Sequence, residues 1–203
     1  MDSLPREYYL QDTLTIAQDL LGKYLVRKVE GICLAGRITE TEAYIGAIDK
    51  ACHAFDGKVT PRTRTLYEKG GTSYVYLIYG MYNCMNVVTE PEGAAAAVLI
   101  RGLEMVTGVE EASRLRYGVE YEELTKQQRK NFANGPGKLC KAMGITRELN
   151  GLDLCKQPFW ITEKIEGVEN PTFDMGVSAR IGIDYAEEAK DFPWRFFVKE
   201  QEG

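Results

Sequence analysis

The hydrophobic residues near the start of the chain recur with a helical period. Residues 12–22 place their apolar side chains on one side of a helix, and these are Leu14, Ala17, Leu20 and Leu21. Asp12 is of a type preferred as a helix N-cap, and Gly22 is of a type preferred just past a helix end. The pattern therefore predicts a short amphipathic helix over residues 12–22.

Further along, short runs rich in β-branched and aromatic residues predict strands. They cover residues 23–30, 32–44, 74–79, 83–88, 94–101, 158–162, 179–183 and 194–198. The first two join at Gly31, and the third and fourth form a hairpin that turns at Gly80. Between these pairs lies a polar loop, 46–71, and a loop of that length in a compact domain is more often functional than idle.

Two further helices are predicted, over residues 108–117 and 135–145, the second beginning with a Gly-Pro-Gly turn. Many short strands and few helices, with no linker between them, are typical of an α+β fold. We therefore expect a single domain over residues 1–203. It should hold a mixed, mostly antiparallel sheet with a protruding β-hairpin and flanking helices.

The composition, 44% hydrophobic and 27% charged, is that of an ordinary globular domain. No apolar run is long enough to span a membrane, and the first residues lack the basic-then-apolar order of a signal peptide. We therefore expect a cytoplasmic protein. Five cysteines without a CxxC spacing, and a single histidine, His53, give no support for metal ligation. We expect no metal and no other cofactor.

Charge is unevenly distributed, although the net charge of -5 argues weakly against a polyanionic partner. Residues 58–69 hold four basic residues and one acid, and residues 126–141 hold five basic residues and no acid. Residues 104–123, by contrast, hold six acids and two arginines. The two basic segments are either solvated loops or a phosphate-binding face.

Three polar side chains share one face of the predicted strand at 32–44, because strand side chains alternate: Glu40, Glu42 and Tyr44. Beside a cleft, Glu42 is a candidate general base. The two carboxylates also suggest glycoside hydrolysis, in which a pair of carboxyl groups flanks the bond. For this stretch alone, a solvated strand face is the simpler interpretation.

Arg101 ends a predicted apolar strand, either as a salt-bridged terminus or as a fixed donor that positions a carboxylate or a water. The segment NGPGK, residues 134–138, lacks the spacing of a nucleotide-triphosphate loop. A glycine-rich turn that leads into a helix can still accept one backbone phosphate, and a plain helix cap is as good an interpretation.

Tyrosines are concentrated in the hairpin YVYLIYGMYNCMN, residues 74–86. Tyr79 precedes Gly80 and so lies near the hairpin tip with Met81. Alone, this pattern is typical of core packing. Together with the basic loops, the lone histidine and the Glu-Tyr strand, it favours base stacking and a wedge that enters DNA.

These motifs together resemble the alkyladenine (3-methyladenine) DNA glycosylase family, in its compact bacterial form without the N-terminal extension of animal members. The motifs occur in the family's order and cover nearly the whole chain, most weakly at 105–131. The matching segments are ITETEAYIG (38–46), ACHAFDG (51–57), TPRTRTLY (60–67), GTSYVYLIYGMYNCMN (71–86), AVLIRGLE (97–104), NGPGKLCKAMGI (134–145), ARIGID (179–184) and PWRFFV (193–198).

The resemblance implies a monofunctional enzyme of base excision repair that flips a damaged purine out of DNA and hydrolyses its N-glycosidic bond. It implies that Glu42 activates the attacking water and that Arg101 helps to hold this water. The remaining roles that it implies are a base pocket of Tyr44, His53 and Tyr76, a clash of Asn86 with the amino group of guanine, intercalation by Tyr79 with Met81, and backbone contacts by Arg62, Arg64 and Lys138.

The implied partner is double-stranded DNA with alkylated or deaminated purines, of the 3-methyladenine, 7-methylguanine, hypoxanthine and ethenoadenine class. We expect a monomer at the bacterial nucleoid and no membrane partner. Two alternatives remain: a non-catalytic nucleic-acid-binding module, and a sugar glycosidase that uses Glu40 and Glu42. A glycosylase-lyase would need a pocket lysine, and no lysine is adjacent to the matched pocket positions.

Overall fold

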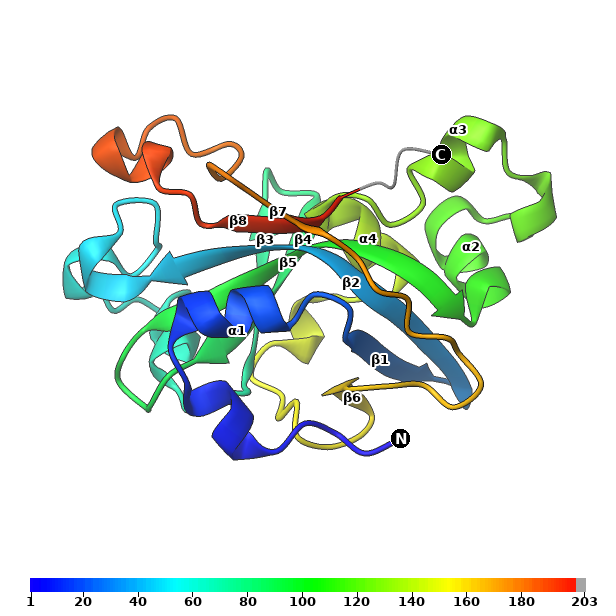
Figure 1. The fold of residues 1–203 in the computed structure, drawn as a ribbon, viewed down its shortest axis with the longest axis horizontal. Helices are drawn as coiled ribbons and strands as arrows, with labels where there is room; N and C mark the ends of the chain where they lie inside the picture. Colours follow the sequence, from blue (N-terminus) through cyan, green and yellow to red (C-terminus); the bar gives the residue numbers. More distant parts are fainter. Residues whose placement is uncertain (200–203) are drawn as a thin grey trace.

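The computed structural model describes residues 1–199, and its strands form a single antiparallel sheet (Figure 1). The strands are β1 (Tyr24–Val29), β2 (Ile32–Ile45), β3 (Ser73–Ile78), β4 (Tyr82–Thr89), β5 (Ala96–Thr107), β6 (Phe159–Thr162), β7 (Met175–Ser178) and β8 (Arg195–Val198). Their order is β3-β4-β5-β2-β1-β6, with β8 paired to both β2 and β7. All the pairings among these strands are antiparallel.

The helices are short. They are α1 (Thr13–Asp19), α2 (Val109–Tyr117), α3 (Lys126–Lys130) and α4 (Pro136–Ala142). Turns of 3-10 helix occur at Arg6–Leu10, Gly46–Ile48, Phe55–Gly57, Arg64–Tyr67, Tyr121–Glu123, Arg147–Leu149 and Glu187–Asp191. In Figure 1, α1 lies below β2 and β5, whereas β7 and β8 run above them. Within residues 1–199, no helix has the length and apolar character needed to cross a membrane.

The long strand β2 changes neighbours along its length, and this positions the site. Its first part pairs with β1, from Val29 opposite Ile32 to Tyr24 opposite Arg37. From Glu40 to Glu42 it pairs instead with β8, while β5 lies along its other edge. The C-terminal segment is thereby brought beside the carboxylates of β2.

The structure confirms the α+β fold, the N-terminal helix with its Asp12 cap, and the hairpin. The strand expected to end at Arg101 was predicted too short. Strand β5 continues to Thr107, because it keeps pairing with β2 beyond a bulge near Glu40. A helix that was not predicted, α3, begins with a capping box of Thr125 and Gln128.

The prediction of a strand at 179–183 was wrong. Strand β7 ends at Ser178, and the next residues form a loop. The reason is a buried ion pair: Arg180 turns inward and binds the carboxylate of Asp49. Because the Arg180 guanidinium is held in the interior, the segment after Ser178 leaves the sheet.

Two of the apolar clusters in the interior position the site. The larger one includes side chains of α1, α2 and α4 together with residues of the central strands. The smaller one lies under the loop 46–71, where Cys52 and Leu66 pack against Tyr74 and Ala97. The long polar loop is therefore anchored on the sheet and forms a wall beside the hairpin.

Candidate active site

The strand register aligns the candidate residues in one row across the sheet. Paired positions run from β3 to β8, through Tyr74, Asn86, Leu99, Glu42 and Arg195. Directly paired residues project to the same face of a sheet. The hairpin, Asn86 and Glu42 therefore contribute to one surface, and a slip of one residue in any of these strands would remove its side chain from that surface.

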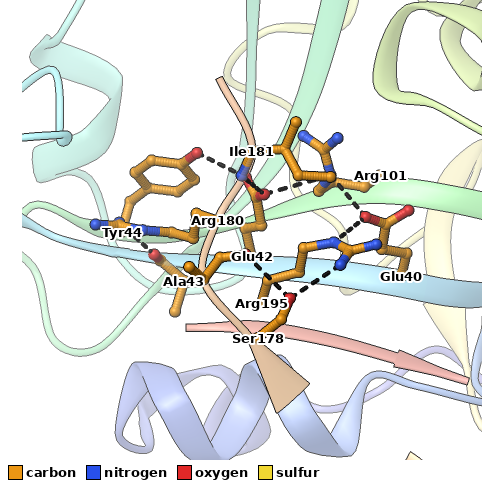
Figure 2. Close-up of polar contacts among 10 residues, drawn as sticks. Glu40, Glu42, Ala43, Tyr44, Arg101, Ser178, Arg180, Ile181 and Arg195 are labelled. Carbon is orange, nitrogen blue, oxygen red and sulfur yellow. Dashed lines mark hydrogen bonds and ion pairs between the residues drawn. The ribbon is translucent and has the colours of Figure 1, made fainter. Parts of the chain in front are cut away.

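Glu42 is fully buried, and its carboxylate is held from three sides (Figure 2). The Tyr44 hydroxyl donates to Oε2 at 2.7 Å, and the backbone N–H of Ile181 donates to Oε1 at 2.8 Å. The Nε atom of Arg101 lies 3.4 Å from Oε1. The predicted shared face of Glu42 and Tyr44 is confirmed by this direct contact.

Glu40 is engaged by two arginines. Its Oε1 accepts from Arg101 Nε at 2.9 Å and from Arg195 Nε, and Arg195 is itself bonded to Ser178 (Figure 2). One guanidinium, that of Arg101, therefore faces both carboxylates of β2. Arg101 is salt-bridged, but it lies within β5 and not at a strand end, so the expected salt-bridged terminus is corrected in that respect.

Burial and hydrogen bonding act in opposite directions on Glu42. Desolvation raises the pKa of its carboxyl group above the ordinary value, and Arg101, the Ile181 N–H and the Tyr44 hydroxyl offset only part of that rise. Burial, with the adjacent Glu42 charge, raises the pKa of Tyr44 well above its usual range, so Tyr44 acts as a hydrogen-bond donor. A carboxylate in these surroundings is a stronger base than one in water.

A cavity of about 170 Å³ lies above this carboxylate. Glu42 does not line it, but its three partners Tyr44, Arg101 and Ile181 do, together with His53, Tyr76, Tyr79 and Asn86. A wider groove of about 960 Å³ borders β8 and includes Glu40, yet none of these aromatic side chains reaches it. Because the three partners of Glu42, the aromatic rings and Asn86 all line the smaller cavity, we take that cavity as the site.

The aromatic wall of the cavity comes from the loop 46–71 and from β3. His53 accepts or donates a bond at 3.0 Å to the Tyr74 hydroxyl, and its ring centroid lies 4.6 Å from that of Tyr76. Burial, with a smaller contribution from the nearby Arg62, lowers the pKa of His53 to about 4. The imidazole is therefore neutral at pH 7.

The guanidinium of Arg62 covers part of this wall. It lies 4.8 Å from the centroid of the Tyr76 ring, and its Nη2 is 3.3 Å from His53 Nε2. The other two basic residues expected at DNA differ in setting. Arg64 is exposed at the start of a 3-10 turn, whereas Lys138, in α4, is half-buried and donates to Asn131.

Asn86 is buried at the floor of the cavity, where its Nδ2 donates to the Tyr74 carbonyl at 3.0 Å. This bond fixes the amide plane against the neighbouring strand. The side chain therefore cannot turn aside to accept a larger ligand without losing a buried hydrogen bond.

The hairpin tip projects two apolar side chains into solvent. Tyr79 is 83% exposed and Met81 is 62% exposed. Positive φ values at Tyr79 (52°) and Gly80 (70°), with a bond from Met81 N to Ile78 O, fit a type I′ turn. A tyrosine with positive φ is strained by roughly 1–2 kcal/mol, and such strain tends to persist where a side chain serves a function.

Sequence reasoning missed the loop that carries Ile181 and Arg180. This loop gives Glu42 a backbone N–H, and a backbone donor cannot be identified from the residue types in a sequence. The arginine in a run that looked like a strand, ARIGI, was the available signal, since an unpaired charge is rare inside a sheet. Across residues 1–199, no group of three or more His, Cys, Asp or Glu side chains is arranged to hold a metal ion.

Comparison with known proteins identifies the class of enzyme. The model of the family described as methylpurine-DNA glycosylase (MPG) matches residues 7–202. The chain therefore belongs to the methylpurine-DNA glycosylase family, and it is a DNA glycosylase, a hydrolase that acts on N-glycosidic bonds.

Curated bacterial relatives match over nearly their whole length. Proteins of Clostridium perfringens (strain SM101) and of Alkaliphilus oremlandii are each 53% identical over 197 residues, which is 97% of this chain and 96% of the relative. A protein of Clostridium tetani is 52% identical with the same coverage. All three carry the name "Putative 3-methyladenine DNA glycosylase".

Proposed function

We propose that this chain flips alkylated or deaminated purines out of duplex DNA and hydrolyses their N-glycosidic bond with a water activated by Glu42, leaving an abasic site. One observation carries the proposal: a buried carboxylate lies beneath an aromatic cavity whose rim bears an exposed tyrosine. The names of the relatives favour 3-methyladenine as one substrate. The cavity is smaller than the ~300–1,000 Å³ of sites for drug-sized ligands, which suits a single base.

Glu42 has the properties of a general base for this step. A carboxylate offers about four lone-pair positions, and the contacts with Tyr44, Ile181 and Arg101 leave capacity for a water. As this water attacks the sugar carbon, its proton passes to Glu42 and the electrons of the broken bond pass to the departing base. The carboxylate charge also stabilises the oxocarbenium-like transition state.

The aromatic wall suits a cationic base. Alkylated purines such as 3-methyladenine and 7-methylguanine carry positive charge, and an electron-rich ring attracts such a cation by ~0.5–2 kcal/mol. A neutral His53 can face this ligand without repulsion, because the pKa of its imidazole is lowered to about 4 by burial. The same positive charge weakens the bond to the sugar, so little acid catalysis is required.

Entry of a base against Tyr76 displaces the guanidinium of Arg62, which covers that ring. In our proposal the released Arg62 then contacts the DNA backbone, as do Arg64 and Lys138. Tyr79, with Met81, fills the gap left in the base stack, since a base inside a duplex must be extruded before chemistry. Asn86 opposes the 2-amino group of normal guanine.

The structure weighs against a sugar glycosidase that uses Glu40 and Glu42. Such an enzyme needs a second carboxyl group that is free to act as acid or nucleophile, and Glu40 is bound by Arg101 and Arg195. Among residues 1–199, no lysine lines the cavity, which supports simple hydrolysis over a Schiff-base lyase. A purely binding module is overturned by membership of an enzyme family.

The substrate range in our proposal is the 3-methyladenine, 7-methylguanine, hypoxanthine and ethenoadenine class, acted on by a monomer at the nucleoid. The test is incubation of the protein with methylated duplex DNA and with inosine-containing duplex, followed by chromatography of the released bases. Release of a free modified base, with an abasic site left in an unbroken strand, is expected. Strand cleavage without added base, or no release from either DNA, would contradict the proposal.

A further inference from the structure

Arg180 is a buried residue that lies outside the cavity and has no role in the mechanism above. Its side chain is fully buried and forms an ion pair with the equally buried Asp49. Its guanidinium also donates to the carbonyl oxygens of Ala43, at 2.8 Å, and Ala189, at 3.0 Å. One side chain thus joins β2, the turn after it and the C-terminal 3-10 turn.

The same guanidinium also packs against two aromatic rings. It lies 4.7 Å from the centroid of the Tyr44 ring and 5.0 Å from that of the Trp194 ring. Tyr44 in turn donates its hydroxyl to Glu42. Figure 2 shows Arg180 and Tyr44 side by side, with the backbone of Ile181 crossing over Glu42.

The residue after Arg180 supplies the backbone N–H that binds Glu42. The Ile181 side chain is 50% exposed, so its own burial does little to hold the loop. Ile183 is buried nearby among Ala51, Ala186 and Ala189, but apolar contacts have no directionality. The hydrogen bonds and ion pair of Arg180 are the directional contacts adjacent to that N–H.

We propose that Arg180 is a positioning residue for the general base: it fixes the loop on β2 so that the Ile181 N–H donates to Glu42 and Tyr44 keeps its place. This inference rests on the proposed role of Glu42. It assigns a part in the reaction to a residue that contacts neither the cavity nor the reacting atoms.

The consequence is a defined pH dependence. Other groups also face or adjoin Glu42, and they are Glu40 and Tyr44 from β2, Cys84 from β4, Arg101 from β5 and Arg195 from β8. Releasing the loop removes the Ile181 N–H, a donor that favours the ionised carboxylate. The pKa of Glu42 then rises further. As the pH is lowered, the excision rate therefore begins to fall at a higher pH than in the wild-type protein.

The test compares Arg180→Lys with a matched control, Arg114→Lys. Arg114 is likewise bound by carboxylates, those of Glu111 and Glu120, but on the exposed surface of α2. Lysine keeps the charge opposite Asp49 but cannot reproduce the two bonds to its carboxylate together with those to Ala43 and Ala189. Single-turnover excision of 7-methylguanine should show an acid limb about one pH unit higher in Arg180→Lys, the effect of one lost hydrogen bond to a charged group.

Amide hydrogen exchange of the segment that contains Ile181 gives a second measurement, independent of catalysis. Exchange there should become about tenfold faster in Arg180→Lys, because the protecting bond opens more often. Arg114→Lys should change neither measurement. A folded Arg180→Lys protein with an unmoved acid limb and unchanged exchange would overturn the inference and leave Arg180 as a packing residue.

Two further variants keep the test decisive. If Arg180→Lys does not fold, Arg180→Gln combined with Asp49→Asn removes both buried charges together and leaves no unpaired ion. Glu42→Gln separates the two proposals. If Glu42→Gln remains active, Glu42 is not the general base and the proposed function fails. If Glu42→Gln is inactive and the Arg180 variant has the pH profile of the wild type, only the inference about Arg180 is overturned.

Discussion

Replacing Tyr79 by alanine separates extrusion of the base from cleavage of the bond. The ring is 83% exposed, so its removal takes almost nothing from the core, and the folded stability should change by less than about 0.5 kcal/mol. Alanine would keep the positive φ of position 79, so the backbone strain of the turn also stays. A loss of function in Tyr79→Ala therefore reports the lost ring.

The size of that loss follows from stacking. One base–aromatic stack contributes ~1–3 kcal/mol, which corresponds to about a 5- to 160-fold weaker flipped complex. The loss should be largest for a lesion paired in duplex DNA, where opening the stack costs most. It should be small for the same lesion in a bulge, which is already partly unstacked.

The assay is single-turnover excision from paired and bulged substrates, with the melting temperature of each variant measured alongside. Tyr79→Phe is the matched control, because it keeps the ring and removes only the hydroxyl, and it should excise from both substrates at close to the wild-type rate. If Tyr79→Ala melts several degrees lower and is impaired equally on both substrates, Tyr79 serves the fold and the wedge role is refuted.

Three further outcomes are expected. Glu42→Gln keeps the side-chain shape but cannot take a proton from water, so excision should fall by orders of magnitude while binding to a stable lesion analogue stays close to normal; survival of excision would exclude Glu42 as the base. Asn86→Ala should raise release of unmodified guanine relative to hypoxanthine, measured by chromatography, and an unchanged ratio would remove Asn86 from substrate selection. Excision should persist in excess chelator, because the proposed mechanism uses a carboxylate-activated water; activity that chelation abolishes and zinc or magnesium restores would contradict it.

The local sequence pattern predicted side-chain positions best where a strand pairs with its neighbours in register. The alternation in ETEAY placed Glu42 and Tyr44 on one face, and the structure joins them through a hydrogen bond. The position of Tyr79 before Gly80 predicted its exposure at the hairpin tip, because a tight hairpin turn directs its side chains away from the sheet. The roles of these residues came from resemblance to a family.

The pattern failed where a distant contact overrides local preference. ARIGI has the composition of a strand, but Arg180 is drawn to Asp49, which is 131 positions away in the sequence, and the segment becomes a loop. Glu40 and Glu42 are equivalent by alternation. Their tertiary contacts distinguish them, because Arg195 of β8 binds Glu40, whereas the Ile181 N–H, from the loop after β7, binds Glu42.

The sequence by itself therefore determined the fold class, the hairpin and the set of side chains that could carry chemistry, since these depend on periodicities of two and 3.6 residues and on turn geometry. The tertiary structure decided which carboxylate is held by arginines and which lies beneath the cavity, how burial shifts the pKa values of Glu42 and His53, and which backbone N–H completes the site. Desolvation and hydrogen bonding depend on what surrounds a group in space, and the groups around Glu42 come from strands and loops far apart in the chain.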